Sequence, residues 1–265
     1  MNKTPLYTTL LWVCCAAVPL VAADPAAPGH WQSLLQDDSA PDWRGWKEPG
    51  FPAGWHVAGG VLSKDGEVDD LVTKESFGDF ELELEWKIGK AGNSGIFYRG
   101  TREYDHIYWS APEYQLLDDA NATDGRSRLT AAASAYALYG PPAGVVLPFD
   151  QWNKTRLVVK GTHVEHWLNG RRVLEYELQS ADWKSRVAAS KFAAYPHYGL
   201  ARSGLIGLQG DHPGTLSVRG IRVRATGAGT GGPALNLSPL QPPHRVVARP
   251  RGERHVRDRG ILIPG

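Results

Sequence analysis

The residues best suited to acid–base chemistry lie in one extended segment, from Glu113 to Asp118. Side chains alternate between the two faces of a strand, so Glu113 and Gln115 share one face while Asp118 belongs to the other. A carboxylic acid beside an amide can transfer a proton and orient a polar ligand in a groove. An ordinary solvated strand face has the same pattern, so the spacing alone leaves both interpretations open.

Two further positions carry a cationic or titratable side chain within β-like segments. Arg99 ends the segment 93–99, and its planar guanidinium could neutralise a carboxylate or hold a hydroxyl-rich ligand. His166 alternates with Val164 and Leu168, so a packed core histidine is as reasonable an interpretation as a proton-transfer group. Either side chain could therefore be structural.

Another polar group follows the β-like segment that ends at Gln209. Asp211 and His212 come directly after Gly210, and an aspartate beside a histidine could bind a metal or orient a base. A turn with a hydrogen-bonded aspartate is the alternative. The sequence has no ligand spacing diagnostic of zinc, no His-Glu-x-x-His, no Gly-x-Ser-x-Gly and no glycine-rich nucleotide loop, so those enzyme classes are not indicated.

The elements that must position these residues have the pattern of strands. Residues 79–88 alternate without a fault, with apolar side chains on one face and Glu81, Glu83, Glu85 and Lys87 on the other. Other β-rich segments are Trp55–Ser63, Gly95–Arg99, Glu113–Leu117, Trp152–Lys160, His163–Leu168, Val173–Leu178, Gly204–Gln209 and Thr215–Arg224. Glycine-containing turn signals separate them, which is typical of antiparallel sheets.

One part of this pattern predicts a specific supersecondary unit. Lys160-Gly161 and Asn169-Gly170 suit tight turns, so residues 152–178 should form a three-stranded meander. A helical pattern covers Ala181–Phe192. Many short strands with one short helix indicate an all-β fold, an antiparallel two-sheet β-sandwich, with one domain covering residues 24–225.

The two ends differ from this body. Residues 1–23 have the pattern of a signal peptide, because Lys3 precedes an uncharged apolar run that ends in small residues. An uncleaved anchor is the alternative, although the run is short for a membrane span. Residues 226–265 are rich in glycine, proline and arginine, which predicts a disordered tail or a basic tether to an anionic surface. The protein is therefore expected in the periplasm or outside the cell.

Composition narrows the function further. Cys14 and Cys15 both lie in the predicted signal peptide, so the mature chain would have neither a disulfide nor a thiolate metal site. Residues 24–225 are mildly acidic, which argues against a nucleic-acid partner. The chain has 10 Trp and 1 Met, a ratio that suits either an all-β core or flat-faced ligands such as sugars. Trp109 and Trp167 are candidate sugar-stacking platforms, with a core or rim position as the alternative for each.

Nine strings, taken together and in order, resemble the bacterial 3-keto-disaccharide hydrolase domain family. The strings are 70–74, 79–82, 85–88, 92–99, 112–118, 137–140, 164–170, 190–192 and 204–209. That family is similar in fold to the concanavalin A-like lectins and glucanases, which implies a jelly roll with a concave ligand face. One string departs from the family, because Gly210 interrupts the usual Leu-Gln-Asp-His-Gly and could displace Asp211 and His212.

The resemblance implies an exported enzyme that cleaves 3-keto-glycosides. A ketone at C3 acidifies the proton on C2, so a base can remove it, the enolate can expel the aglycone from C1, and water can then add. The residues implied as catalytic are Glu113, Gln115, His166 and Lys191. Those implied to bind the substrate are Glu85, Arg99, Asp118, Tyr139 and Gln209. Glu85 is expected on a strand next to that of Glu113, and a divalent metal is a further candidate, with Asp211 and His212 as its ligands.

Two other functions fit the same fold, because a fold does not fix a function. A non-catalytic carbohydrate-binding module would line its groove with Trp and amide side chains. A conventional glycoside hydrolase would need two carboxyl groups roughly 5–10 Å apart across a sugar-sized cleft. All three interpretations predict a carbohydrate partner, no nucleic acid and no membrane span once the signal peptide is removed.

Overall fold

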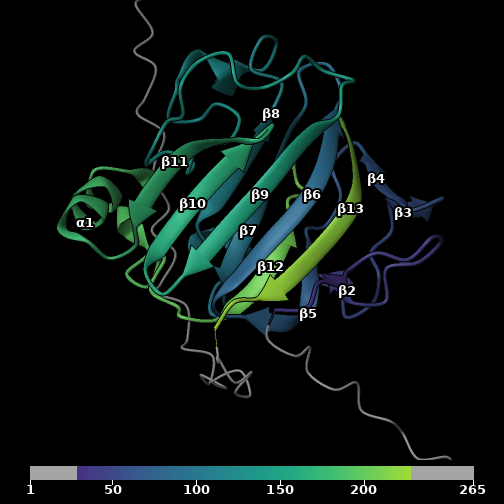
Figure 1. Cartoon of the computed structure of the whole chain (residues 1–265), viewed down its shortest axis with the longest axis horizontal. Coiled ribbons are helices and arrows are strands. Elements are labelled where there is room, and N and C mark those ends of the chain that lie inside the picture. Colours follow the sequence, from purple (N-terminus) through teal and green to yellow (C-terminus); the bar gives the residue numbers. More distant parts are fainter. Residues whose placement is uncertain (1–28, 228–265) are drawn as a thin grey trace, which may run out of the picture.

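Two antiparallel β-sheets pack face to face in the computed structural model, which describes residues 29–227 (Figure 1). The larger sheet has the strand order β11-β10-β9-β6-β13-β4-β3, and β1 pairs with β13. Its strands are β1 (Gln32–Ser33), β3 (Trp55–Ala58), β4 (Val61–Asp65), β6 (Phe80–Ile88), β9 (Asn153–Lys160), β10 (His163–Leu168), β11 (Arg171–Glu177) and β13 (Thr215–Ala225).

The smaller sheet has the order β2-β5-β12-β7-β8 and lies behind the larger one in Figure 1. Its strands are β2 (Trp43–Gly45), β5 (Leu71–Phe77), β7 (Asn93–Gly100), β8 (Glu113–Leu117) and β12 (Gly204–Leu208). All strand pairs in both sheets are antiparallel. The predicted two-sheet β-sandwich is therefore confirmed, and so is the meander, which is β9-β10-β11.

Strand β6 shows why this sequence forms a sandwich. Its alternate residues from Phe80 to Ile88 are buried in the core between the sheets. The glutamates of its other face pair with Arg219, Arg222 and Arg224 of the neighbouring strand β13. Apolar burial on one face and opposite charges across strands on the other both favour the same register.

Several strands depart from the sequence prediction, among them the short strands β1 and β2, which were not predicted. Segment 55–63 is a hairpin of two strands, because Gly59 and Gly60 both adopt positive φ values and turn the chain there. Strand β5 was not predicted. Its residues Leu71, Val72 and Thr73 are consecutively buried, so the segment lacks the alternation that marks a half-buried strand.

The predicted helix at 181–192 divides into two shorter elements. Helix α1 (Ala181–Ala188) begins after Ser180, whose side chain accepts a hydrogen bond from Trp183 N at 3.1 Å. Ser190 repeats this arrangement at the start of the 3₁₀ turn η3 (Lys191–Ala194), where its Oγ accepts from Phe192 N. Two further 3₁₀ turns, η1 (Ile107–Trp109) and η2 (Thr123–Arg126), lie in the loops on either side of β8.

The strand order overturns one expectation about the site. Strand β6 pairs with β9 and β13, whereas β8 pairs with β7 in the other sheet. The prediction that Glu85 lies beside Glu113 is therefore wrong. Glu85 lies on the outer face of the larger sheet, where its Oε2 accepts a hydrogen bond from Arg219 Nε at 2.7 Å. A period of two assigns a face to each residue but does not identify the neighbouring strand.

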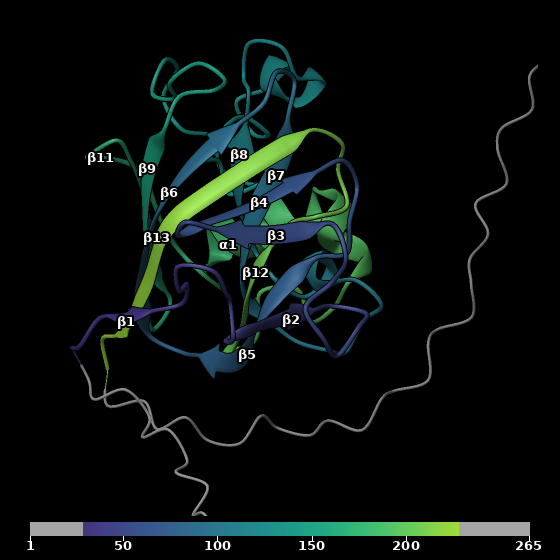
Figure 2. The same ribbon diagram turned by 90° about the vertical axis from the view of Figure 1, so that its right-hand side faces the viewer.

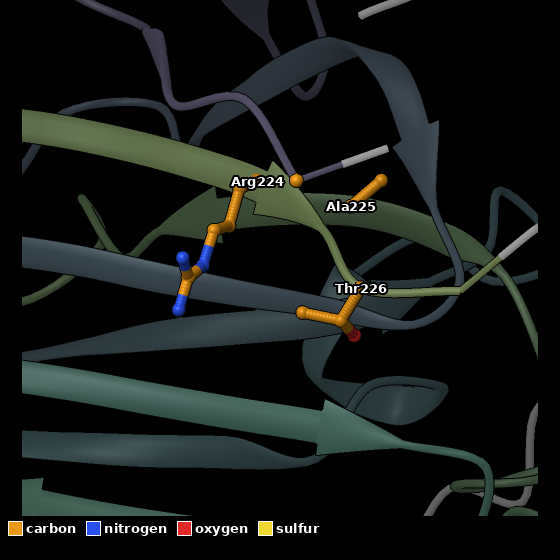
Figure 3. Close-up of a pocket in the computed structure, with 4 residues that line it drawn as sticks. Arg224, Ala225 and Thr226 are labelled. Atoms are coloured by element: carbon orange, nitrogen blue, oxygen red, sulfur yellow. The ribbon is translucent and has the colours of Figure 1, made fainter. Parts of the chain in front are cut away.

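The two ends of the described chain meet at one corner of the sandwich, where β1 lies beside the end of β13 (Figure 2). Gly29 N donates to Ala225 O at 3.0 Å, and a crevice of about 340 Å³ opens there, lined by Gly29, Arg224, Ala225 and Thr226 (Figure 3). The predicted signal peptide lies outside the described residues, as does nearly all of the predicted tail. No helix within residues 29–227 is long and apolar enough to cross a membrane.

Arg99, at the end of β7, ties the smaller sheet to two turns of the larger one. Its Nε and Nη2 donate to Gly78 O, its Nη2 also donates to Asp79 Oδ1, and its Nη1 donates to Gly161 O at 2.8 Å. The side chain is 4% exposed. These contacts occupy the guanidinium and give Arg99 a structural role, and the pair with Asp79 is one of the two alternatives that the sequence left open, neutralisation of a carboxylate.

Replacing this residue should reveal that role. An Arg99→Ala variant leaves the Gly78 and Gly161 carbonyls without their donor, and we expect it to lower the free energy of unfolding by about 1–3 kcal/mol. The matched control is Arg202→Ala, because Arg202 is an exposed arginine near Arg99 and should cost less than about 0.5 kcal/mol. Urea denaturation measures both, and equal midpoints for the two variants would contradict this role.

Candidate active site

The outer face of the smaller sheet carries a polar patch at its centre. Ile96, Tyr114 and Ile206 point into the core between the sheets, so the residues that alternate with them point outward. Register places Gly95 beside Gln115, and Phe97 beside both Glu113 and Gly207. The two sequence-predicted residues of β8 are therefore neighbours on one face, as their spacing predicts.

Gly95 leaves the space that the Glu113 carboxyl occupies. A Cβ at position 95 would overlap the carboxyl and Cγ of Glu113, so any side chain there would displace it. Glu113 leans across the neighbouring strand as a result and is 5% exposed. The glycine thus has a packing role, because it lets a carboxyl lie flat on the sheet.

Gln115 holds this carboxyl in place. Its side-chain amide lies between Asn93 and Glu113, and with its nitrogen toward Glu113 it donates to Glu113 Oε1 at 2.9 Å and to Ser94 O at 3.2 Å. In the opposite orientation its oxygen faces Glu113 and its nitrogen donates to Asn93 Oδ1 at 3.1 Å. The amide can therefore donate to a carboxylate or accept from a protonated carboxyl, as the charge state of Glu113 requires.

A loop along the free edge of β8 brings a cation to the same place. Tyr136 N donates to Glu113 O at 3.1 Å, and the ring of Tyr136 lies 4.3 Å from Lys191 Nζ. The Tyr136 hydroxyl donates to Asp124 Oδ2 at 3.1 Å, which fixes the ring. Lys191 is close enough to Glu113 for its charge to lower the pKa of that carboxyl.

Burial nevertheless dominates at Glu113 and raises its pKa from 4.5 to about 8. The charge of Lys191 opposes this rise, while the negative charges of Asp211, Asp70 and Asp124 add to it. A carboxyl with a pKa near neutrality can both take and release a proton at physiological pH. Such a perturbed group in a polar patch is typical of an active site.

Asp70 and Asp211 form the opposite side of the patch. Burial raises the pKa of Asp70 to about 7, although its Oδ1 accepts a hydrogen bond from Gly210 N at 2.7 Å. The 210–214 loop is held from behind by Lys64, a buried lysine whose Nζ donates to His212 O at 2.7 Å and to Gly214 O at 3.3 Å. The loop that presents Asp211 is thereby fixed at both of its ends.

Aromatic side chains lie at one side of the patch. Burial raises the pKa of Tyr108 to about 12, and the nearby charges of Asp211, Asp70 and Glu113 add to this rise. Trp109 stacks on Tyr195, with ring centroids 5.1 Å apart and planes 14° apart. This stacked pair offers the flat apolar surface that suits a sugar ring.

Four sequence-predicted residues lie apart from this patch or are occupied elsewhere. His166 is buried between the sheets, where its ring bonds to Ala133 O and the Tyr176 hydroxyl at 3.0 Å each and burial lowers its pKa to about 4. The Asp118 carboxylate accepts hydrogen bonds from Ala91 N, Ala120 N and Asn121 Nδ2 in a turn. The Tyr139 hydroxyl donates to Asp182 of α1 at 2.7 Å, and Trp167 lies on the outer face of the larger sheet under Arg156.

The candidate metal ligands Asp211 and His212 do not gather a ligand set in residues 29–227. The group of three that could hold an ion there is His163, Glu165 and Glu175 on the outer face of the larger sheet, where Arg172 already pairs with both glutamates. The acids around Glu113 do not bring three ligand atoms within 4.8 Å of one another. Among the described residues, the acids around Glu113 therefore do not form a three-ligand cluster of carboxylate and imidazole groups.

Sequence reasoning missed several residues of the patch. Asp70 stands in one of the family-like strings but was not singled out, because the strand that follows it lacks alternation. Lys64 has the ordinary surroundings of a surface lysine in sequence. Tyr108, Asp124 and Tyr136 come from loops, which no periodicity describes. The burial of an acid or a lysine is the signal that identifies them, and it requires the structure.

The raised pKa of Glu113 has a consequence for stability. Between about pH 4.5 and pH 8 the folded protein holds a proton on Glu113 that the unfolded chain has lost, so the free energy of unfolding falls as pH rises across this range. A Glu113→Gln variant cannot ionise there. We expect it to gain stability over the wild type by at least about 1 kcal/mol when pH is raised from 5 to 9.

Urea denaturation at the two pH values measures this gain. The control is Glu83→Gln, because Glu83 lies on the opposite face of the sandwich, paired with Arg222. If Glu113→Gln differs from the wild type by the same free energy of unfolding at pH 5 and at pH 9, the conclusion that Glu113 is buried and protonated is contradicted.

Comparison with known proteins places this site in a family. Residues 30–224 match the 3-keto-alpha-glucoside-1,2-lyase-like domain. A 3-keto-disaccharide hydrolase of Bacteroides thetaiotaomicron is 36% identical over 215 residues, which cover 69% of this chain and 73% of that protein. A crystal structure of a candidate glycosyl hydrolase from Parabacteroides distasonis is 30% identical, with a TM-score of 0.68 over 73% of this chain and 93% of that one. A second from the same organism is 27% identical, with a TM-score of 0.59 over 74% and 99%.

These matches cover nearly all of the described residues and agree with the strings that the sequence alone singles out. They confirm an enzyme of carbohydrate hydrolysis over a binding module without catalysis. The chain belongs to the 3-keto-alpha-glucoside-1,2-lyase-like family.

Proposed function

We propose that this protein is an exported enzyme that cleaves 3-keto-glycosides by elimination followed by hydration. The observation that carries this proposal is the buried Glu113 carboxyl, which has a pKa of about 8 and lies between Lys191 and Gln115. Removal of a carbon-bound proton is favoured by a base whose pKa lies near the operating pH and by a positive charge beside the oxygen of the resulting enolate. Glu113 and Lys191 provide the two.

In the first step the ionised Glu113 carboxylate takes the proton from C2. The electrons of the C2–H bond form a C2=C3 double bond, and the negative charge passes to the oxygen on C3. The ammonium group of Lys191 stabilises this oxygen by charge and hydrogen bonding. Gln115 is a positioning residue, because it donates to Glu113 Oε1 and keeps the carboxylate aimed at the substrate.

In the second step the enolate collapses. The C3 ketone reforms, a C1=C2 double bond forms, and the bond from C1 to the glycosidic oxygen breaks. The proton on Glu113 passes to the departing oxygen, and its raised pKa suits this transfer as well as the first. Water then adds its oxygen to C1 and a proton to C2, so the sum of the steps is hydrolysis.

Export rests on residues 1–23, whose charged start, apolar run and small terminal residues suit a cleaved signal peptide. Cell fractionation and the N-terminal sequence of the recovered protein test it. A protein that begins near Asp24 and is found in the periplasm or medium supports export, whereas an intact N-terminus in the cytoplasm contradicts it.

Turnover of a 3-keto-glucoside should depend on Glu113. We expect Glu113→Gln to lower kcat at least about 100-fold, because the amide can neither take nor deliver the proton. Glu83→Gln, on the opposite face, is the matched control and should retain wild-type turnover. The assay measures release of a chromogenic aglycone from the keto sugar and from the unoxidised glucoside. Unchanged turnover in Glu113→Gln, or equal cleavage of the unoxidised glucoside, would refute this mechanism.

Lys191 should set both the rate and its pH dependence. The base must be ionised, so kcat/KM rises with pH through the pKa of Glu113. Removing the positive charge in Lys191→Met raises that pKa, and we expect the profile to shift to higher pH while kcat falls about 10-fold or more. Lys184→Met, an exposed lysine of α1, is the control. A profile shifted to lower pH would contradict the proposed contact of Lys191 with Glu113.

A further inference from the structure

Two buried oxygen atoms beside the Glu113 patch have no hydrogen-bond partner among the described residues. They are Gln209 Oε1 and Asp211 Oδ1. Gln209 is 4% exposed and follows directly after β12. A buried acceptor without a donor is costly, so unpaired acceptors of this kind point to a missing donor.

The backbone holds both residues firmly. Gln209 N donates to Gly95 O at 2.9 Å, and Gln209 O accepts from Ser94 Oγ at 2.8 Å, so the main chain is bonded on both sides. Gly210 N bonds to the Asp70 carboxylate, and Lys64 fixes the carbonyls of the following loop. The main chain that carries the two side chains is thus fixed, and what Gln209 Oε1 and Asp211 Oδ1 lack is a donor from outside the described residues.

The two oxygens and Lys191 lie on opposite sides of Glu113, which would orient a bound sugar. Gln209 lies next to Gly95, over which Glu113 leans, on the side of the sheet toward β12 and β5. Lys191 lies on the other side, with Tyr136 of the loop along the edge of β8. Adjacent strands are about 4.8 Å apart, so the span from β8 to β12 is roughly 10 Å. This distance suits one hexose with its substituents.

We propose that the C6 hydroxyl of the keto sugar lies between Gln209 and Asp211 and donates its single proton to a three-centre hydrogen bond shared by Gln209 Oε1 and Asp211 Oδ1, an inference that rests on the proposed function. In a pyranose ring the ketone carbon C3 lies opposite the ring oxygen, and the C6 hydroxyl is carried on that opposite side. With the ketone oxygen at Lys191 and C1 and C2 over Glu113, the C6 hydroxyl points toward β12. The two oxygens of Gln209 and Asp211 thus select a hexose that has this donor.

Matched substrates test the assignment on the purified full chain. A chromogenic 3-keto-glucoside is compared with its 6-deoxy and 4-deoxy analogues by kcat/KM. We expect the kcat/KM of the wild type to be about 100-fold lower on the 6-deoxy analogue, because the missing C6 hydroxyl leaves the buried acceptors unpaired. The loss of kcat/KM on the 4-deoxy analogue should be smaller. An equal or greater loss on the 4-deoxy analogue would overturn the assignment to C6.

Variants separate the subsite from a general loss of activity. Gln209→Leu should have a lower kcat/KM than the wild type on the parent sugar. Its kcat/KM values on the parent and on the 6-deoxy analogue should lie within about threefold of each other. Gln151→Leu, an exposed glutamine in the turn before β9, is the matched control and should keep the full discrimination. Retained discrimination in Gln209→Leu would refute the subsite.

Asp211→Asn provides a readout independent of the sugar. Because the charge of Asp211 raises the pKa of Glu113, this variant should shift the kcat/KM profile to lower pH while it loses discrimination against the 6-deoxy analogue. Calorimetric titration with Ca²⁺ and Mg²⁺ completes the test. A cation that binds the wild type but not Asp211→Asn, with discrimination unchanged, would identify these oxygens as ion ligands and overturn the proposal.

Failure of the proposed function remains distinguishable. If the wild type does not cleave the parent keto sugar, the mechanism fails, and calorimetry then compares binding of methyl glucoside with its 6-deoxy analogue. If the wild type binds the 6-deoxy sugar more weakly than methyl glucoside, and Gln209→Leu binds the two sugars equally, the subsite is still supported. Equal binding of the two sugars would overturn it.

Discussion

The burial of one carboxyl on the outer face of a β-sheet is the constraint around which the site is built. Glu113 can lie there because Gly95, on the adjacent strand, has no side chain to oppose it. Burial of an acid is unfavourable unless the acid is protonated or paired, and the pKa of about 8 expresses that cost. The Gln115 amide, the Lys191 ammonium and the loop through Tyr136 each act on this single group.

Lys191 and the acids on the other side pull the same pKa in opposite directions. Lys191 lowers it, whereas Asp211 and Asp70 raise it, and burial exceeds both influences. A less buried glutamate would be a weak base, and one paired directly with the lysine would be weaker still. The balance instead leaves a carboxyl that is ionised often enough to remove a proton and protonated often enough to return it. An elimination that moves one proton from carbon to oxygen requires both properties of its catalyst.

The fold and the centre of the site could be predicted from sequence, but their surroundings could not. Period-two alternation assigns Glu113 and Gln115 to one face, because that relation holds within a single strand. Pairing between distant strands is not a local property, so the expected contact of Glu85 with Glu113 failed when β6 and β8 proved to be in different sheets. His166 and Arg99 have the composition of functional residues, yet the partners that occupy them, Tyr176 and the turns at Gly78 and Gly161, come from remote parts of the chain. Lys191 reaches the site from a short 3₁₀ turn that sequence periodicity describes as the end of a helix.

The unpaired oxygens of Gln209 and Asp211 and the buried acid Glu113 place related demands on a ligand. A sheet face that holds Glu113, Asp70 and Asp211 close together is electrostatically unfavourable, because Asp211 raises the pKa of both Glu113 and Asp70, and Asp70 raises that of Glu113. A ligand that brings hydroxyl donors to one side relieves part of that cost without neutralising Glu113, which the reaction needs as a base. A cation in the same place would lower the pKa of Glu113 and weaken it as a base. The proposed chemistry and the unpaired acceptors therefore favour the same occupant, a sugar that is bound through its hydroxyl groups on one side and through its ketone on the other.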